Sequence, residues 1–123
     1  MGVVTVLIAD DQRLFADALA AILSTDERIE VVGRAANGRE AVELAHERRP
    51  DVVLMDLSMP LVDGFEATRE ILRALPETRV LVVTGSASAA DVARARQAGA
   101  AGYITKDRIA EDLVRAIFGV AES

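Results

Sequence analysis

Short apolar runs alternate with segments of helical periodicity five times along this chain. The five runs are Val3–Ala9, Ile29–Ala35, Val52–Met55, Val80–Val83 and Gly102–Thr105. Strands that alternate with helices form a parallel sheet, because each helix carries the chain back over the sheet by a right-handed crossover. The sequence therefore predicts an α/β fold built on one parallel five-stranded sheet.

The polarity of the runs predicts their order in the sheet. Central strands of a parallel sheet are covered on both faces and are continuously apolar, whereas edge strands are not. The first, third and fourth runs are continuous, while Glu30 and Arg34 interrupt the second and small or polar residues interrupt the fifth. This pattern fits the flavodoxin-like order 2-1-3-4-5, a doubly wound (βα)5 arrangement with the second and fifth strands at the edges.

The segments between the runs carry helix signals. The first of them carries one apolar stripe at helical spacing, made of Leu14, Phe15, Ala18, Leu19, Ile22 and Leu23. Asn37 and Glu40 resemble a capping box, in which both side chains satisfy backbone donors at a helix start. That helix is expected to run to about Arg49, because Pro50 stops it.

Composition excludes several classes of function. A length of 123 residues fits a single domain, residues 1–123. The formal net charge of −6 argues against direct binding of a nucleic-acid duplex, which needs clustered Lys and Arg. The absence of cysteine excludes disulfides and thiolate metal sites. Because the start does not resemble a signal peptide and no apolar stretch approaches the roughly 20 residues that span a bilayer, we expect a cytoplasmic protein without membrane contact.

Charged and hydroxyl side chains follow four of the five runs. They are Asp10 and Asp11 after the first, Asp56 after the third, Thr84 after the fourth and Lys106 after the fifth. In a parallel sheet these positions share the carboxyl edge, where ligands bind in open α/β folds. Three crowded carboxylates attract a cation, and a hydroxyl with an ammonium suits a bound oxyanion. The set therefore predicts a metal-assisted phosphoryl site.

Each of these residues also has a purely structural interpretation. Asp10 or Asp11 is suited to capping a helix, and Asp56 to capping a loop amide. Thr84 and Lys106 are unremarkable when taken singly, and Tyr103 is equally well explained by core packing. The functional interpretation makes the carboxylates a site for Mg²⁺, or Mn²⁺ in its place, and makes Asp56 a nucleophile that forms an aspartyl phosphate.

With this set of residues, the chain resembles the bacterial response-regulator receiver domains of the CheY-like superfamily over its whole length. The motifs that carry the resemblance are Asp10-Asp11, Asp56 with Met59-Pro60 and Gly64, Thr84-Gly85, and Gly102–Lys106. Further motifs resemble the NarL/FixJ (LuxR-type) subgroup, namely Val6–Asp11, Val31–Gly33 and Ala98–Asp107. The resemblance implies a regulatory phosphoacceptor that is not itself an enzyme.

The resemblance also implies a role for each matching residue. A sensor histidine kinase would phosphorylate Asp56, and Mg²⁺ would be held by Asp10, Asp11, Asp56 and the backbone carbonyl of Ser58. Thr84 and Lys106 would contact the phosphoryl oxygens, Tyr103 would swing inward on activation, and Ser58 and Ser86 would tune dephosphorylation. Implied partners are the kinase, a second copy on activation, and DNA through a helix-turn-helix output domain outside this chain.

One departure and several rival functions stay open at this stage. Asp107 stands where many receivers have a proline after a cis peptide bond, so the peptide isomer is undetermined and Asp107 is a candidate partner for Lys106. A flavin carrier is disfavoured because Asp10-Asp11 would repel its phosphate. A hydrolase of small phosphate esters lacks an evident substrate cap. A stand-alone or phosphorylation-independent adaptor that binds a partner protein is the alternative function.

Overall fold

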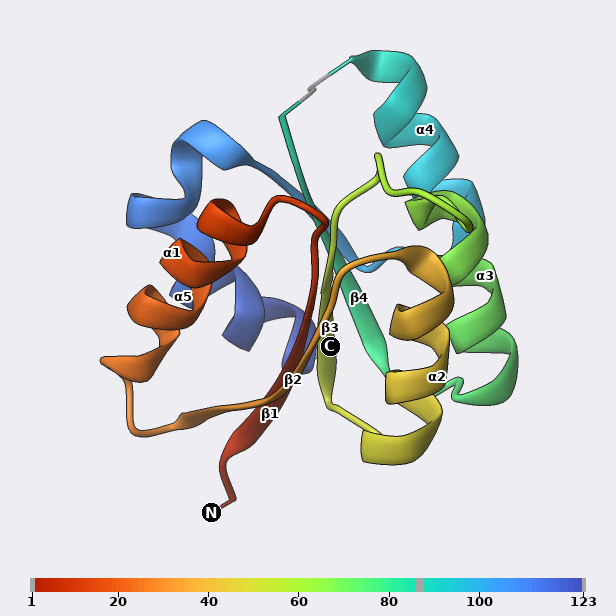
Figure 1. Ribbon diagram of the computed structural model, residues 1–123. Helices are drawn as coiled ribbons and strands as arrows, with labels where there is room; N and C mark the ends of the chain where they lie inside the picture. Colours follow the sequence, from red (N-terminus) through yellow and green to blue (C-terminus); the bar gives the residue numbers. More distant parts are fainter. Residues whose placement is uncertain (1, 86–87, 123) are drawn as a thin grey trace.

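The computed structural model describes residues 2–85 and 88–122 and contains one parallel five-stranded sheet (Figure 1). The strand order is β2-β1-β3-β4-β5, which confirms the order expected from the polarity of the runs. The strands are β1 (Val4–Ala9), β2 (Ile29–Ala35), β3 (Val52–Met55), β4 (Arg79–Thr84) and β5 (Gly102–Thr105). The helices are α1 (Arg13–Ser24), α2 (Gly38–Arg48), α3 (Gly64–Ala74), α4 (Ala89–Ala98) and α5 (Ile109–Ala121), with a 3₁₀ turn at Lys106–Arg108.

Two strand boundaries differ from the runs in the sequence. Val3 lies before β1 and is 45% exposed, because the ladder with β2 begins only at Val4. The strand β4 is longer than its apolar run and includes Arg79, which pairs with β3, and Thr84, which pairs with Thr105 of β5. Thr84 is therefore the last residue of its strand, in register with the end of the neighbouring strand.

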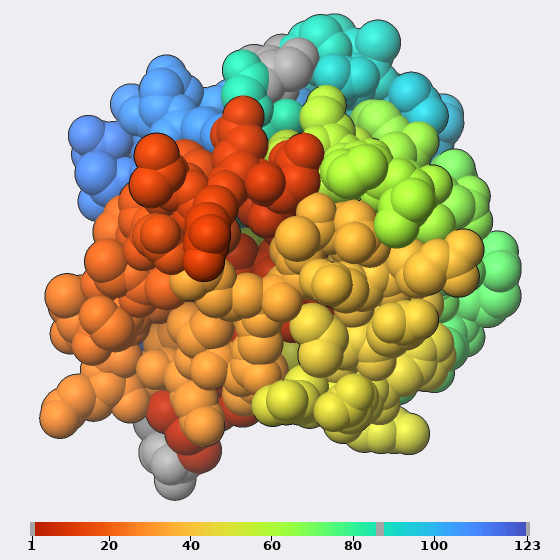
Figure 2. Space-filling model, viewed as in Figure 1, coloured from red at the N-terminus to blue at the C-terminus, as the bar shows by residue number. Residues whose placement is uncertain are grey.

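The helices cover the sheet in two layers, with α1 and α5 on one face and α2, α3 and α4 on the other (Figure 1). Alternate residues of each central strand supply the two cores. In β1, Val6 and Ile8 pack with the α1 and α5 side, whereas Leu7 and Ala9 pack with the opposite layer. The near face in Figure 2 shows the edge strand β2 between α1 and α2. The continuous apolar character of the central strands follows from this double coverage.

Short polar side chains begin three of the helices. Asn37, Asp63 and Ser88 each accept a hydrogen bond from the backbone N–H three residues later, at 2.8, 2.9 and 3.1 Å respectively. The Glu40 carboxylate returns to the backbone N–H of Ala36 at 2.8 Å, so the expected capping pair at the start of α2 is confirmed. Among the described residues, no helix combines the length and the apolar character needed to cross a membrane.

The apolar stripe of α1 is only partly buried, because Leu14 and Ala18 lie outside the buried face. Both are exposed, Leu14 at 84%, whereas the buried residues are Ala16, Leu19 and Leu23. At 3.6 residues per turn, Leu14 and Ala18 each lie about 200° around the helix from Ala16, on the side that faces away from the sheet. The stretch is so rich in Ala and Leu that spacing alone allowed a stripe displaced from the true one.

Gly64 allows the loop after β3 to fold back against the start of α3. A Cβ at this position would lie 2.3 Å from the carbonyl oxygen of Asp56 and 2.7 Å from Cα of Leu57. These are backbone atoms that cannot rotate away, so any side chain there must displace the loop. Glycine at this position therefore fixes the backbone that presents Asp56.

We expect Gly64→Ala to lower the free energy of unfolding by about 1–3 kcal/mol or more, the cost of overpacking a rigid site. Gly119→Ala is a matched control, because a Cβ there meets nothing within 4 Å and lies inside α5, where Ala favours the helix. Urea denaturation of both variants measures the difference. Equal stability of the two variants would contradict the close approach at Gly64.

Candidate functional site

Backbone pairing of β1 with β3 places Asp10 beside Asp56. The strands end in register at Ala9 and Met55, and the N–H of Asp56 donates to the carbonyl of Ala9 at 2.9 Å. The N–H of Asp10 in turn donates to the carbonyl of Ala35 at the end of β2. Asp10 and Asp56 each follow the last residue of a strand, so their carboxylates lie at the same edge of the sheet.

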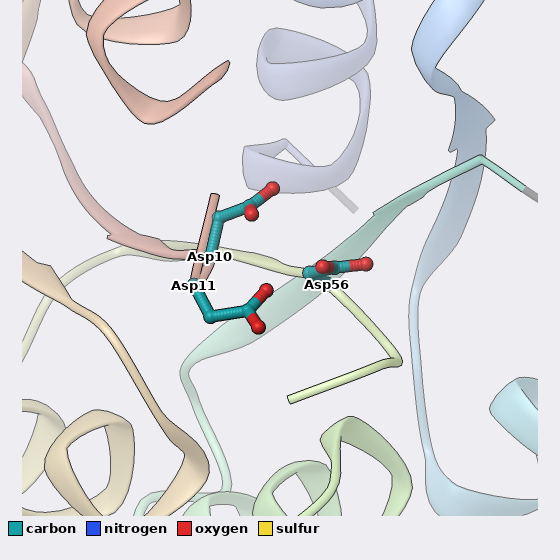
Figure 3. Close-up of side chains that lie close together, drawn as sticks. All are labelled: Asp10, Asp11 and Asp56. Carbon is teal, nitrogen blue, oxygen red and sulfur yellow. The ribbon is translucent and has the colours of Figure 1, made fainter. Parts of the chain in front are cut away.

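The three aspartates form one acidic cluster (Figure 3). One carboxylate oxygen from each of Asp10, Asp11 and Asp56 lies within 4.8 Å of the others. Asp10 and Asp56 are each only 5% exposed, whereas Asp11 is exposed. Buried carboxylates in such proximity repel one another unless a cation lies among them. The cluster thus has the hard oxygen donors that Mg²⁺ requires.

Asp10 carries a buried oxygen whose hydrogen-bonding capacity is unused. Its Oδ1 accepts a hydrogen bond from the backbone N–H of Gln12 at 2.8 Å. Its Oδ2 is buried and accepts no hydrogen bond from the described residues, although the ammonium of Lys106 lies 3.1 Å away. The Lys106 ammonium therefore offsets the negative charge of Asp10, but its geometry is not that of a hydrogen bond to Oδ2. An unsatisfied anionic oxygen facing two further carboxylates fits a cation ligand and is costly otherwise.

Lys106 supplies the positive charge nearest to the acidic cluster. Its Nζ lies 3.1 Å from Asp10 Oδ2 and 3.7 Å from Asp56 Oδ2, and its side chain is 18% exposed. The suggested pairing with Asp107 is not found, because Asp107 is exposed and the ion pairs of Lys106 within the described part of the chain are with the two aspartates. The peptide bond between Lys106 and Asp107 is trans.

Burial raises the pKa of Asp56 from 3.8 to about 6. This pKa is a net result: burial and the negative charges of Asp10 and Asp11 raise it, while Lys106 and a hydrogen bond from the backbone N–H of Ser58 lower it. These contributions show a carboxylate whose charge is poorly compensated by the protein alone. Asp56 is still ionised at neutral pH, when it can act as a ligand or a nucleophile.

The remaining expected residues lie at or near the same edge. Thr84 is 4% exposed and ends β4, next to β5, which ends directly before Lys106. Tyr103 is half-buried against the core on the α4 side, and burial raises its pKa, with a further contribution from the charge of Asp91. Ser58 is exposed beside Asp56. Ser86 lies outside the described residues.

Two neighbours of Lys106 were missed from the sequence. The side-chain oxygen of Gln12 accepts a hydrogen bond from Lys106 Nζ at 2.8 Å, and the ammonium lies 4.3 Å from the ring centroid of Phe15. Gln12 directly follows the Asp10-Asp11 pair and Phe15 belongs to the apolar stripe of α1, but no motif marks either residue as a neighbour of Lys106. Lys106 itself stands out in the sequence, because it is the only lysine among the 14 basic residues of the chain.

Comparisons with known proteins agree with this geometry. Residues 6–118 match the response regulator receiver domain family. The transcriptional regulatory protein LnrK from Bacillus subtilis (strain 168) is 40% identical over 117 residues, which are 95% of this chain and 53% of LnrK. The chain spans about half the length of the curated relatives it matches.

Solved structures show the same fold. The signal receiver domain of NarL from Mycobacterium tuberculosis has a TM-score of 0.93 and 34% identity, over 100% of this chain and 99% of that one. A LuxR-family two-component response regulator from Aurantimonas sp. SI85-9A1 has a TM-score of 0.93 and 32% identity, over 98% of this chain and 86% of that one. The CheY-like fold and the resemblance to LuxR-type regulators are thereby confirmed. The chain belongs to the response-regulator receiver domain family.

Proposed function

We propose that this chain accepts a phosphoryl group from a phosphohistidine of a sensor histidine kinase onto Asp56. The observation that carries the proposal is the cluster of Asp10, Asp11 and Asp56, with an unsatisfied oxygen on Asp10 and the ammonium of Lys106 beside it. Family membership supports the same assignment, because receiver domains of response regulators are regulatory. A carboxylate is a competent nucleophile toward phosphorus, and catalysis of such transfers is mainly a matter of position and charge.

Each residue of the site has a separate role in the phosphoryl transfer. Asp10, Asp11, Asp56 and the backbone carbonyl of Ser58 would hold Mg²⁺, which neutralises the charge that accumulates as the phosphoryl group approaches. A carboxylate oxygen of Asp56 attacks phosphorus, the bond from phosphorus to the donor imidazole breaks, and the imidazole leaves. Lys106 then donates a hydrogen bond to a phosphoryl oxygen. The transfer needs no phosphodonor other than the kinase side chain.

The phosphorylated site then acts as a switch. The new group brings a charge of roughly −1.5 to −2 to one point, and oxygens that attract nearby donors. Thr84 donates its hydroxyl to one of these oxygens, and Tyr103 moves inward behind it. Ser58 and Ser86 tune the rate at which water removes the group. The chain thus assists its own phosphorylation and dephosphorylation without turning over an external substrate.

The output is proposed to be transcription. LnrK carries the name of a transcriptional regulatory protein, and the chain spans about half its length. We infer that residues 1–123 form the single receiver domain of a cytoplasmic regulator whose helix-turn-helix domain binds DNA. Phosphorylation is expected to favour a homodimer. The net charge of −6 is consistent with DNA binding outside this domain.

Intact-mass spectrometry after incubation with acetyl phosphate tests the proposal. We expect a gain of one phosphoryl group that needs Mg²⁺ and is absent from Asp56→Asn. Asp63→Asn is the matched control, because Asp63 caps α3 and Asn caps helices equally well. Retention of the gain in Asp56→Asn, or its absence from the unmodified chain with Mg²⁺, would refute phosphorylation at Asp56.

A further inference from the structure

The side chain of Gln12 is used in an unexpected way. Gln12 is the N-cap residue of α1, a position that favours short side chains able to accept hydrogen bonds from the first backbone N–H groups. It makes no such capping bond. Its Oε1 instead accepts a hydrogen bond from Lys106, 94 positions away in the sequence. This hydrogen bond connects the start of α1 to the 3₁₀ turn after β5.

Lys106 meets three kinds of group at one point. Gln12 Oε1 lies 2.8 Å from the ammonium, Asp10 Oδ2 lies 3.1 Å away and Asp56 Oδ2 lies 3.7 Å away. The Phe15 ring centroid is 4.3 Å from Nζ, within the range of a cation–π interaction. Of the three oxygen contacts, the one with Gln12 is the shortest. Of these groups, the Gln12 amide is therefore the best placed to hold the ammonium beside the acidic cluster.

We propose that Gln12 is a positioning residue that holds Lys106 at the acidic cluster before a phosphoryl group arrives. This inference rests on the proposed function of Lys106 as a contact to that group. The backbone N–H of Gln12 also donates to Asp10 Oδ1 at 2.8 Å, so one residue orients both a carboxylate and the ammonium. A lysine side chain is long and flexible, and an anchor at its tip removes the entropy cost of ordering it during transfer.

Nuclear magnetic resonance of the Lys106 ammonium tests the anchor without any phosphorylation. Because Lys106 is the only lysine, its side-chain ¹H–¹⁵N signal is unambiguous. In the metal-free protein we expect one slowly exchanging ammonium signal, which broadens with faster solvent exchange in Gln12→Met. Gln97→Met, a substitution on the exposed side of α4, should leave the signal unchanged. Gln12→Glu keeps an oxygen acceptor at the same reach, so its Lys106 ammonium signal should remain slowly exchanging, unlike that of Gln12→Met.

The rate of phosphorylation tests the consequence of the anchor. At saturating Mg²⁺ we expect Gln12→Met to slow the reaction with acetyl phosphate by about threefold to tenfold, the effect of one lost hydrogen bond. In a Lys106→Met background the same substitution should have no further effect, because Gln12 acts only through Lys106. An equal slowing in both backgrounds would overturn the inference.

The two experiments separate this inference from the proposed function. If the unmodified chain does not react with acetyl phosphate at all, the phosphoacceptor proposal fails, and the ammonium signal still decides whether Gln12 holds Lys106. If the chain reacts but the ammonium signal is absent from the unmodified protein, or exchanges equally fast in Gln12→Met, the positioning role is wrong while phosphorylation of Asp56 stands.

Discussion

Asp56→Asn is expected to stabilise the metal-free protein at pH 7, raising the free energy of unfolding by about 1–3 kcal/mol. The pKa of Asp56 rises from 3.8 to about 6 on folding, chiefly through burial. A group whose pKa is raised by folding favours the folded state below its unfolded pKa, and that contribution is lost as the pH rises through the folded pKa. At pH 7 the ionised carboxylate therefore opposes folding, and an amide of the same shape does not.

The stabilisation should depend on pH and on the metal. Urea denaturation in the presence of a chelator should show the full gain at pH 7, a smaller gain near pH 5 and almost none below about pH 3, where Asp56 is protonated in both states. Addition of Mg²⁺ should stabilise the unmodified chain more than Asp56→Asn and so reduce the difference. Asp63→Asn should show no comparable pH dependence. A loss of stability in Asp56→Asn at pH 7 would contradict an uncompensated charge at the site.

Substitutions of Asp11 and Lys106 should change the affinity for Mg²⁺ in opposite directions. Asp11→Asn removes a negative charge from the cluster, so we expect the dissociation constant to rise at least about tenfold. Lys106→Met removes an ammonium that lies 3.1 Å from Asp10 and 3.7 Å from Asp56, so we expect the dissociation constant to fall about threefold to tenfold. Isothermal titration calorimetry with Mg²⁺ at pH 7 measures both.

The control for these titrations is Asp112→Asn, which removes a carboxylate on α5 that pairs with Arg108. Its affinity for Mg²⁺ should match that of the unmodified chain. Affinity should also fall as the pH drops below about 6, because protonated Asp56 is a poor ligand. Weaker binding in Lys106→Met would show that the ammonium supports the cation site and does not compete with it.

The strand order and the gathering of the site were predictable because both follow from the parallel sheet. Glu30 and Arg34 marked an edge strand, and the sheet order is as they indicated. Asp10, Asp11 and Asp56 each follow an apolar strand, and strands in register bring such residues together whatever the details of the loops. These two features could be predicted because they depend only on regular backbone geometry.

Details that depend on side-chain direction were not predictable. Leu14 belongs by spacing to the apolar stripe of α1, but it is exposed, because an Ala-rich helix leaves the centre of its buried face ambiguous. The contact between Gln12 and Lys106 joins the start of α1 to the 3₁₀ turn after β5, and neither residue follows a periodic pattern that would reveal it. Asp107 was a candidate partner for Lys106, but the buried aspartates stand closer to the ammonium.

Identification of the residue that carries the phosphoryl group is the decisive measurement. After reaction with acetyl phosphate and Mg²⁺, borohydride reduces an aspartyl phosphate to homoserine, which peptide mass spectrometry can locate. Conversion at Asp56, with Asp10 and Asp11 unchanged, is the expected result. Conversion at Asp10 or Asp11, or phosphorylation that leaves all three aspartates unreduced, would contradict the role of Asp56 as the phosphoacceptor.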